Sequence, residues 1–198
     1  INILNSPKFE LDEIGTPVPF KWNKCKLETI SFGHGITTTP LQAAAAYASL
    51  INGGKLILPT LEKNKNNDVN FRRVISEETS KKIKRILRKV VTDEKGTASL
   101  ADIYGYNVSG KTGTSQYYDD ENKNINTFIS FFTAANKDYI LLVMLDDPQV
   151  ARNLIYNYRG IKIKGTRNEA GWNAVYTSGK IIEKIGPILA INNNEVLK

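Results

Sequence analysis

Residues 105–112 match the phosphate-binding pattern G-x-x-x-x-G-K-[ST] letter for letter. In nucleotide-binding proteins this pattern forms a glycine-rich loop that cradles phosphates with its backbone N–H groups, while the lysine reaches the outer phosphates. Such a loop also needs a helix that begins at the lysine and threonine. Here Lys111 and Thr112 are followed by glycine, threonine and serine at 113–115, which are poor helix formers. Nucleotide binding therefore stays an alternative interpretation of these residues.

The same residues can instead be one unit on a β-strand. The set K-T-G, S-x-x-K and S-D-N forms the active site of penicillin-binding proteins and class A β-lactamases. The segment 108–114, Val-Ser-Gly-Lys-Thr-Gly-Thr, is similar to the strand motif of class B penicillin-binding proteins. Further similar segments are Gly33-His34-Gly35-Ile36, Thr39-Pro40-Leu41-Gln42, Ala46-Tyr47, Asn52-Gly53-Gly54, Gly96-Thr97-Ala98 and Asp146-Asp147-Pro148. The chain thus resembles the C-terminal part of the transpeptidase domain of class B penicillin-binding proteins, especially the septal cell-division type.

This resemblance implies a serine D,D-transpeptidase that cross-links peptidoglycan stem peptides at D-Ala-D-Ala and is acylated by β-lactams. It gives Lys111 and Thr114 catalytic roles, Lys111 as a fixed positive charge and Thr114 through an N–H in the oxyanion hole. It also makes Lys111, Thr112, Gly113 and Thr114 the substrate-binding residues. The two threonine hydroxyls would bind the substrate carboxylate, and the missing side chain of Gly113 would let the ligand lie close along the strand. No metal and no cofactor is implied.

The motifs that supply the nucleophile are missing from these 198 residues. No serine in the chain begins an S-x-x-K or an S-x-N pattern, and in the family these motifs lie upstream. Residues 1–198 are therefore expected to be the C-terminal portion of a transpeptidase domain, inactive alone and completed by the upstream half of the same domain. A non-catalytic penicillin-binding module that keeps the ligand strand is the main alternative.

The resemblance also implies where the parent protein works and what it meets. An upstream membrane anchor would hold the domain on the outer, periplasmic face of the bacterial cytoplasmic membrane. Cell-division or elongation proteins are the expected partners, and nucleic acid is not. The 27 Lys and Arg residues outnumber the 20 Asp and Glu residues, which gives a net charge of +7. Much of this excess lies at 81–89, which we interpret as the solvated face of a helix.

The remaining composition excludes several other kinds of site. Cys25 is the only cysteine and His34 the only histidine, so neither an internal disulfide nor a multi-histidine metal site can form. Apolar residues make up 41% of the chain and charged residues 24%, as in an ordinary globular protein. We interpret His34 as a turn residue between two glycines and Cys25 as a residue without a nucleophilic role.

Two helices are predicted ahead of the motif. The first covers 39–52, with Thr39 as its cap, Pro40 at its first position and glycines 53 and 54 at its end. The second begins near Ser76 and ends near Thr92, because its apolar residues follow helical spacing. These apolar residues are Ile83, Ile86, Leu87, Val90 and Val91.

Strands are predicted around and after the motif, at 107–116, 127–134 and 139–145. Their short connections permit only antiparallel neighbours. Residues 1–32 and 149–171 are predicted to be loops, 172–185 a helix closed by the Gly-Pro pair at 186–187, and 192–198 a polar tail. The expected fold class is α+β, β-lactamase/transpeptidase-like, an antiparallel sheet flanked by helices, with the helix at 39–52 buried behind the sheet.

Overall fold

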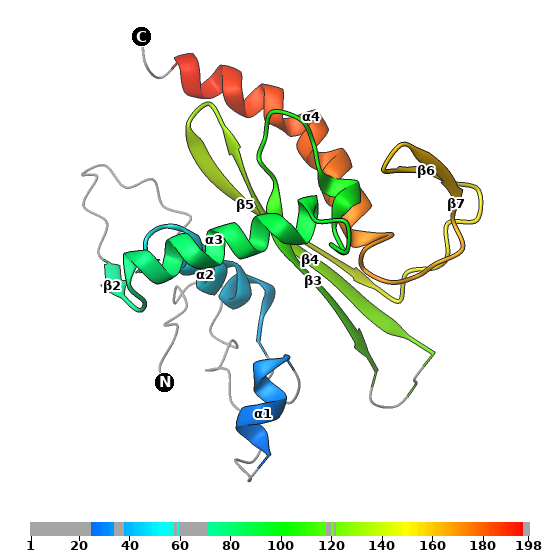
Figure 1. Ribbon diagram of the computed structural model, residues 1–198, viewed down its shortest axis with the longest axis horizontal. Coiled ribbons are helices and arrows are strands. Elements are labelled where there is room, and N and C mark those ends of the chain that lie inside the picture. The colour runs from blue at the N-terminus through cyan, green and yellow to red at the C-terminus, as the bar shows by residue number, and fades with distance from the viewer. Residues whose placement is uncertain are drawn as a thin grey trace. The chain divides into compact units, whose positions relative to one another are not determined.

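The computed structural model describes most of the chain and divides it into two compact units, residues 1–81 and 82–198 (Figure 1). The described residues are 25–33, 38–57, 59, 71–117, 120 and 122–195. Each unit is a mixture of helices and antiparallel strands, so the predicted α+β class is confirmed. The assignment of 1–198 to one portion of a single domain stays a prediction.

The first unit contains α1 (Lys26–Ser31), α2 (Pro40–Ile51), β1 (Lys55–Ile57) and β2 (Phe71–Arg73). Strands β1 and β2 pair antiparallel. The prediction of a loop over 1–32 is wrong at α1, because a helix of six residues with no side-chain cap is too short to show a periodic pattern. The predicted helix at 39–52 is confirmed as α2, whereas its place behind the sheet stays a prediction.

The start of α2 is fixed by a reciprocal pair of hydrogen bonds. Thr39 Oγ1 accepts from the Gln42 backbone N–H at 3.2 Å, and Gln42 Oε1 accepts from the Thr39 N–H at 2.9 Å. This capping box satisfies two N–H groups that the helix itself cannot. Gly53 and Gly54 follow the helix with φ of 85° and 86°, a conformation that favours glycine. The predicted cap and stop of this helix are therefore confirmed.

Helix α3 (Glu77–Thr92) also begins as predicted, with Ser76 Oγ accepting from the Thr79 N–H at 3.1 Å. Leu87 and Val91 of the predicted apolar stripe are buried, but the prediction is wrong at Ile86, which is 62% exposed. Several basic side chains of the helix make contacts within the protein. Lys84 pairs with Asp138 at 2.9 Å, and Arg88 pairs with Asp102 at 2.8 Å.

The second unit is built on an antiparallel sheet in the order β3-β4-β5. Its strands are β3 (Ser109–Gln116), β4 (Asn124–Ala134) and β5 (Lys137–Asp146), which confirms the three predicted strands. A two-residue turn joins β4 to β5, with positive φ at Ala135 and Asn136 as a tight hairpin requires.

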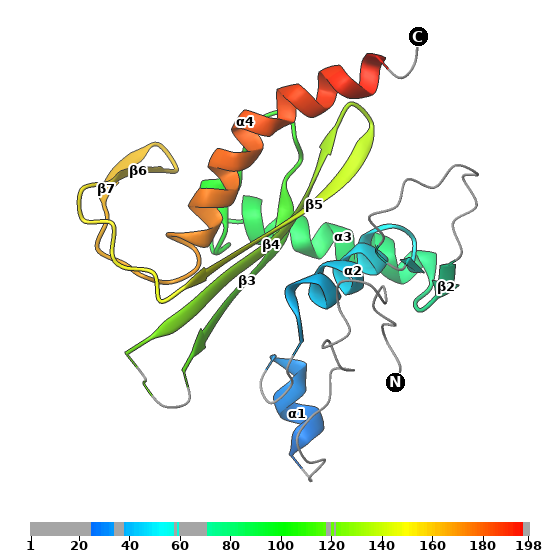
Figure 2. The same ribbon diagram turned by 180° about the vertical axis from the view of Figure 1, so that it is seen from behind.

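Helix α4 (Ala174–Glu195) packs on one face of this sheet (Figure 2). A short 3₁₀ helix, η1 (Ser99–Ala101), packs against α4. The core between them includes Phe128 and Phe132 of β4 and Val175 and Ile182 of α4. Burying such side chains typically contributes about 1.5–3 kcal/mol each.

The predicted end of the last helix near 185 is wrong. Helix α4 continues through Gly186 and Pro187 to Glu195, although an interior proline removes one helical hydrogen bond. Ile185 and Leu189 pack against the core on either side of the pair. Packing over these turns offsets the lost hydrogen bond, and it also orders part of the predicted polar tail at 192–198.

The prediction of a loop over 149–171 is also wrong, because β6 (Ile155–Tyr158) and β7 (Ile161–Lys164) form an antiparallel hairpin there. Positive φ values at Arg159 and Gly160 close the turn. The buried ring of Tyr156 meets those of Trp172 and Tyr176 edge to face, with centroids 5.4 and 5.1 Å apart. These aromatic contacts stabilise strands that are too short to be predicted with certainty from their pattern.

Candidate functional site

The four residues of the sequence motif lie together in β3. Lys111, Thr112, Gly113 and Thr114 pair with residues 126–129 of β4. Lys111 and Thr112 sit inside a strand and no helix begins there, so the nucleotide-binding alternative is wrong. Within the part of the chain that the structure describes, β3 pairs only with β4. Its other edge thus offers backbone groups to an extended ligand.

The two threonines share one face of β3, as their spacing predicts. The Thr112 and Thr97 hydroxyls are hydrogen-bonded at 3.0 Å. Thr114 Oγ1 accepts a hydrogen bond from the Ala170 N–H at 3.3 Å, so its own O–H can still donate. Both hydroxyls are therefore held in place and keep hydrogen-bonding capacity for a ligand.

The Lys111 ammonium is exposed and makes a hydrogen bond to its own strand. Its Nζ donates to the Thr112 carbonyl oxygen at 2.7 Å. Among the described residues it forms no ion pair with a carboxylate. An ammonium group has three donors, so Lys111 can still bind an anion beside the strand.

The two glycines of β3 differ in whether the fold leaves room for a side chain. A Cβ on Gly110 would lie 2.8 Å from Cζ of Phe128 and would also collide with the Ile129 carbonyl oxygen. A Cβ on Gly113 would meet nothing closer than Cβ of Thr127 at 3.9 Å. Packing therefore requires a glycine at 110, whereas the fold has room for a side chain at 113.

The start of β3 is fixed by helix α3. Arg88 donates a hydrogen bond to the carbonyl oxygen of Val108, the buried residue just before the strand, while it pairs with Asp102. On the neighbouring strand, the buried Asn126 side chain donates to the Asn168 carbonyl oxygen. These contacts fix β3 at one end and the segment that follows the β6–β7 hairpin at the other.

A hollow of about 470 Å³ lies on the threonine face of β3. Its lining comes from the segment after α3, from β3 and from the chain around the β6–β7 hairpin. The lining residues are Glu94, Lys95, Gly96, Thr97, Thr112, Thr114, Tyr158, Arg167, Glu169, Ala170, Gly171 and Trp172. The sequence motifs include only the two strand threonines and the Gly-Thr pair at 96–97. Glu94 and Lys95 follow the predicted end of the second helix, and the remaining lining residues lie in the predicted loop 149–171 or at the predicted helix start at 172.

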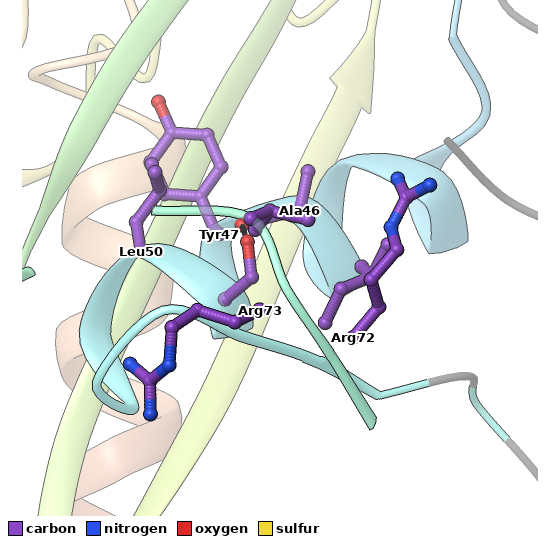
Figure 3. Close-up of a pocket in the computed structure, with 8 residues that line it drawn as sticks. Ala46, Tyr47, Leu50, Arg72 and Arg73 are labelled. Carbon is purple, nitrogen blue, oxygen red and sulfur yellow. Dashed lines mark hydrogen bonds between the residues drawn. The ribbon is translucent and has the colours of Figure 1, made fainter. Parts of the chain in front are cut away.

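A second cavity, of about 590 Å³, lies in the first unit between α2 and the two short strands (Figure 3). Ala46, Tyr47 and Leu50 contribute from the helix, and Arg72 and Arg73 extend their guanidinium groups in opposite directions. Burial raises the pKa of the Tyr47 phenol above its ordinary value. The hydroxyl of Ser49, which also lines the cavity, donates a hydrogen bond to the Ala46 carbonyl oxygen at 2.6 Å. This arrangement gives no activated nucleophile.

Two further residues singled out in the sequence are His34 and Cys25. His34 lies outside the described residues. Cys25 is an exposed free thiol just before α1. Within the described ranges, no cluster of His, Cys, Asp and Glu side chains could hold a metal ion. The helices of those ranges also include none that is long and apolar enough to span a membrane.

Comparison with known proteins identifies one matching family model and several proteins of similar sequence. The family model described as "Penicillin binding protein transpeptidase domain" matches residues 8–166. The "Probable peptidoglycan D,D-transpeptidase FtsI" of Caulobacter vibrioides (strain NA1000 / CB15N) is 31% identical over 210 residues, covering 100% of this chain and 34% of that protein. "Stage V sporulation protein D" of Bacillus subtilis (strain 168) is 38% identical over 136 residues, covering 61% and 21%. The chain thus spans about a third or less of the length of these relatives.

Solved structures of the same fold are also similar. The crystal structure of a peptidoglycan glycosyltransferase from Burkholderia ambifaria matches with a TM-score of 0.68 and 19% identity, over 93% of this chain and 53% of that one. The transpeptidase domain of Burkholderia pseudomallei penicillin-binding protein 3 matches with a TM-score of 0.62 and 24% identity, over 84% and 49%. At these identities the likeness establishes the fold, an antiparallel sheet flanked by helices.

Proposed function

The chain belongs to the family of penicillin-binding protein transpeptidase domains, and from that premise we propose that it supplies the substrate-binding strand of a peptidoglycan D,D-transpeptidase. The reaction would be acyl transfer, in which a serine attacks the D-Ala-D-Ala bond of one stem peptide and an amine from a second stem resolves the acyl-enzyme. The serine and its lysine would come from the rest of the same protein, since no S-x-x-K occurs in this chain.

In this proposal β3 binds and orients the donor stem. Lys111 supplies a fixed positive charge at the strand, and the hydroxyls of Thr112 and Thr114 hydrogen-bond the substrate carboxylate. The Thr114 N–H supplies one donor of the oxyanion hole, where charge develops in the transition state. The observation that carries the proposal is the room beside Gly113, because the fold does not need a glycine there and a ligand backbone does.

The whole protein would then act on the outer, periplasmic face of the cytoplasmic membrane, where peptidoglycan is cross-linked. β-Lactams would acylate it by mimicking the stem dipeptide. The resemblance to the septal type of these proteins supports a role in cell division, with division proteins as partners. The upstream half of the transpeptidase domain would complete the domain together with this chain.

Acylation by a fluorescent penicillin tests the proposal in the full-length product of the gene. Lys111→Ala should lower the second-order acylation rate at least about tenfold, because charge-assisted hydrogen bonds contribute about 1.5–3 kcal/mol. Lys137→Ala is the matched control, since Lys137 is an exposed strand lysine of β5 and should leave the rate unchanged. Equal rates for wild type and Lys111→Ala would contradict the role of Lys111.

A non-catalytic penicillin-binding module is the second candidate, because such a module would also keep the K-T-G-T strand. The same protein preparation separates the two. A catalyst forms a covalent adduct that survives denaturation, whereas a binding module is protected from thermal unfolding by penicillin and releases it on denaturation. Neither adduct nor protection would exclude both candidates.

A further inference from the structure

Asn168, in the segment that follows the β6–β7 hairpin, is joined to three other parts of the second unit. The buried Asn126 side chain of β4 donates a hydrogen bond to its carbonyl oxygen. Asn173, just before α4, donates to the same carbonyl oxygen and to Asn168 Oδ1, each at 3.2 Å. Asn168 Nδ2 donates in turn to the carbonyl oxygen of Pro148, after the end of β5. These contacts hold the segment at 168 from several sides.

This network lies next to the contact that holds the second threonine of the strand motif. Ala170, two residues after Asn168, is buried, and its N–H donates to Thr114 Oγ1 at 3.3 Å. Thr114 is also the β3 residue directly opposite Asn126 in the β3–β4 ladder. Contacts thus lead from Thr114 across the ladder to Asn126, on to the 168–170 segment, and back to Thr114. A closed path of this kind fixes the Ala170 N–H relative to the strand.

The Ala170 contact decides which bonds the Thr114 hydroxyl can make. A hydroxyl group has one donor hydrogen, and it rotates to suit the partners around it. Because the Ala170 N–H donates to the oxygen, the hydroxyl hydrogen of Thr114 points away from that N–H and is available to an acceptor such as a carboxylate. A shift of the 168–170 segment would remove this constraint and let the hydroxyl turn.

Stability alone does not explain an asparagine at 126. Asn126 is fully buried, and its Oδ1 has no hydrogen-bond partner among the described residues. A buried polar atom without a partner lowers stability. Because Asn173 also donates to the Asn168 carbonyl oxygen, an apolar side chain at 126 would leave that oxygen with a donor. The amide at 126 is therefore better explained by the position that it gives to residue 168.

We infer that Asn126 and Asn168 are positioning residues for acylation, which orient the Thr114 hydroxyl toward the carboxylate of the bound substrate or β-lactam. Asn126 is fully buried, so it acts only through the 168–170 segment. The inference rests on the proposed function, because that function gives the Thr114 hydroxyl a carboxylate to bind. It adds to the strand motif two residues that belong to no motif of the sequence.

The test compares acylation of the full-length product by benzylpenicillin and by its methyl ester, each measured in competition with a fluorescent penicillin. The ester lacks the carboxylate charge, so its acylation depends much less on a hydroxyl that binds the carboxylate. Asn126→Leu, which has nearly the shape of asparagine without the amide, should lower the second-order rate with benzylpenicillin about threefold to tenfold, and the rate with the ester by less than about twofold. Equal losses with both probes would mean that Asn126 only supports the fold, and the inference would be overturned.

A second variant and a double variant make the test independent of how well Asn126→Leu folds. Asn168→Ala removes the bond to the Pro148 carbonyl oxygen and should show the same selective loss. Thr114→Val removes the hydroxyl itself. Adding Asn126→Leu to it should give no further loss, because substitutions that act through one group are not additive. Additive losses in the double variant would contradict a role through Thr114.

Ser130→Ala is the matched control on the same strand. Ser130 is a buried polar residue of β4, and its hydroxyl donates to the Leu141 carbonyl oxygen at 3.0 Å, within the sheet. Its loss should lower the melting temperature but leave the ratio of the two acylation rates as in wild type. A changed ratio in Ser130→Ala would show that any lost hydrogen bond of β4 disturbs the site, and the specific role of Asn126 would be refuted.

Acylation of the wild-type protein separates this inference from the proposed function. A full-length product that benzylpenicillin does not acylate would refute the proposed function, and the positioning role would fail with it. A product that is acylated, but at equal rates in wild type, Asn126→Leu and Asn168→Ala, would refute the positioning role alone.

Discussion

At the scale of single residues, a substitution at Gly113 distinguishes a requirement of ligand binding from a requirement of folding. We expect Gly113→Ala in the full-length product to change the free energy of unfolding by less than about 1 kcal/mol, because its φ is not positive and the added methyl group would meet no close neighbour. The new methyl group would stand where a ligand backbone is proposed to lie. The acylation rate with fluorescent penicillin should therefore fall about tenfold or more, measured beside a urea unfolding curve of the same variant.

Gly110→Ala provides the contrasting control on the same strand. Its methyl group would collide with Phe128 and with the backbone of β4, so overpacking should cost about 1–3 kcal/mol or more of stability. If Gly113→Ala were as destabilising as Gly110→Ala, the room observed beside Gly113 would have no functional meaning.

The residues of the site differ in how far the sequence could predict them. Lys111, Thr112 and Thr114 were found because a four-letter motif places them on one strand. Arg167 and Trp172 left no comparable signal, since their closeness to β3 depends on a hairpin and on contacts such as that between Asn126 and Asn168. Long-range contacts of this kind have no local pattern.

At the scale of elements, a hydrogen bond from α3 fixes the residue that precedes β3, the strand that carries the K-T-G-T motif. Arg88→Met should lower the free energy of unfolding by about 1–3 kcal/mol, because the buried carbonyl group of Val108 would lose its charged donor. Urea denaturation followed by circular dichroism measures this loss. Lys84→Met is the control on the same helix, and its more exposed pair with Asp138 should contribute less than about 1 kcal/mol. A smaller loss for Arg88→Met than for Lys84→Met would contradict the anchoring role.

The β4–β5 hairpin should show a weak dependence on acid. Desolvation raises the pKa of Asp138, but hydrogen bonds from Thr133 and Lys84 and the Lys84 charge outweigh it and leave the pKa below its ordinary value. A lowered folded-state pKa stabilises the fold above the unfolded-state pKa of about 3.9, and this contribution is lost as the pH falls through the folded-state value.

Asp138→Asn tests this dependence. The variant should be less stable than wild type by under about 1 kcal/mol at pH 7, and the difference should shrink only below about pH 4. Thermal unfolding of both proteins between pH 3 and pH 7 measures it. A difference that stayed constant down to pH 3 would mean that the carboxylate charge has no part in holding the hairpin.

Elements were predictable where one local signal was strong. Helices α2 and α3 combined caps with periodic or alanine-rich sequence, and the three long strands alternated with clear turns. The continuation of α4 through Pro187 and the β6–β7 hairpin were missed because packing decides both. Ile185 and Leu189 pack against the core around the proline, and Tyr156 meets Trp172 and Tyr176 across the hairpin.

At the scale of the whole molecule, the chain contains the strand for which we propose substrate binding, but no S-x-x-K or S-x-N motif. Residues 1–198 alone should therefore form no covalent adduct with a fluorescent penicillin, whereas the full-length product should form one that survives denaturation. A serine hydroxyl is a weak nucleophile unless a base lies within hydrogen-bond reach. Ser109, the serine nearest to Lys111 along β3, is buried and its hydroxyl donates to the Asn107 carbonyl oxygen at 3.2 Å.

Gel fluorescence after denaturation measures both proteins side by side, with pre-acylation by unlabelled penicillin as the control for specific labelling. Labelling of residues 1–198 that the unlabelled drug blocks would mean that a serine of this chain is the nucleophile, and the division of labour proposed here would be wrong. Labelling of the full-length product alone would place the nucleophile outside this chain. Lys111, Thr112 and Thr114 would then act on an acyl group that another part of the same protein carries.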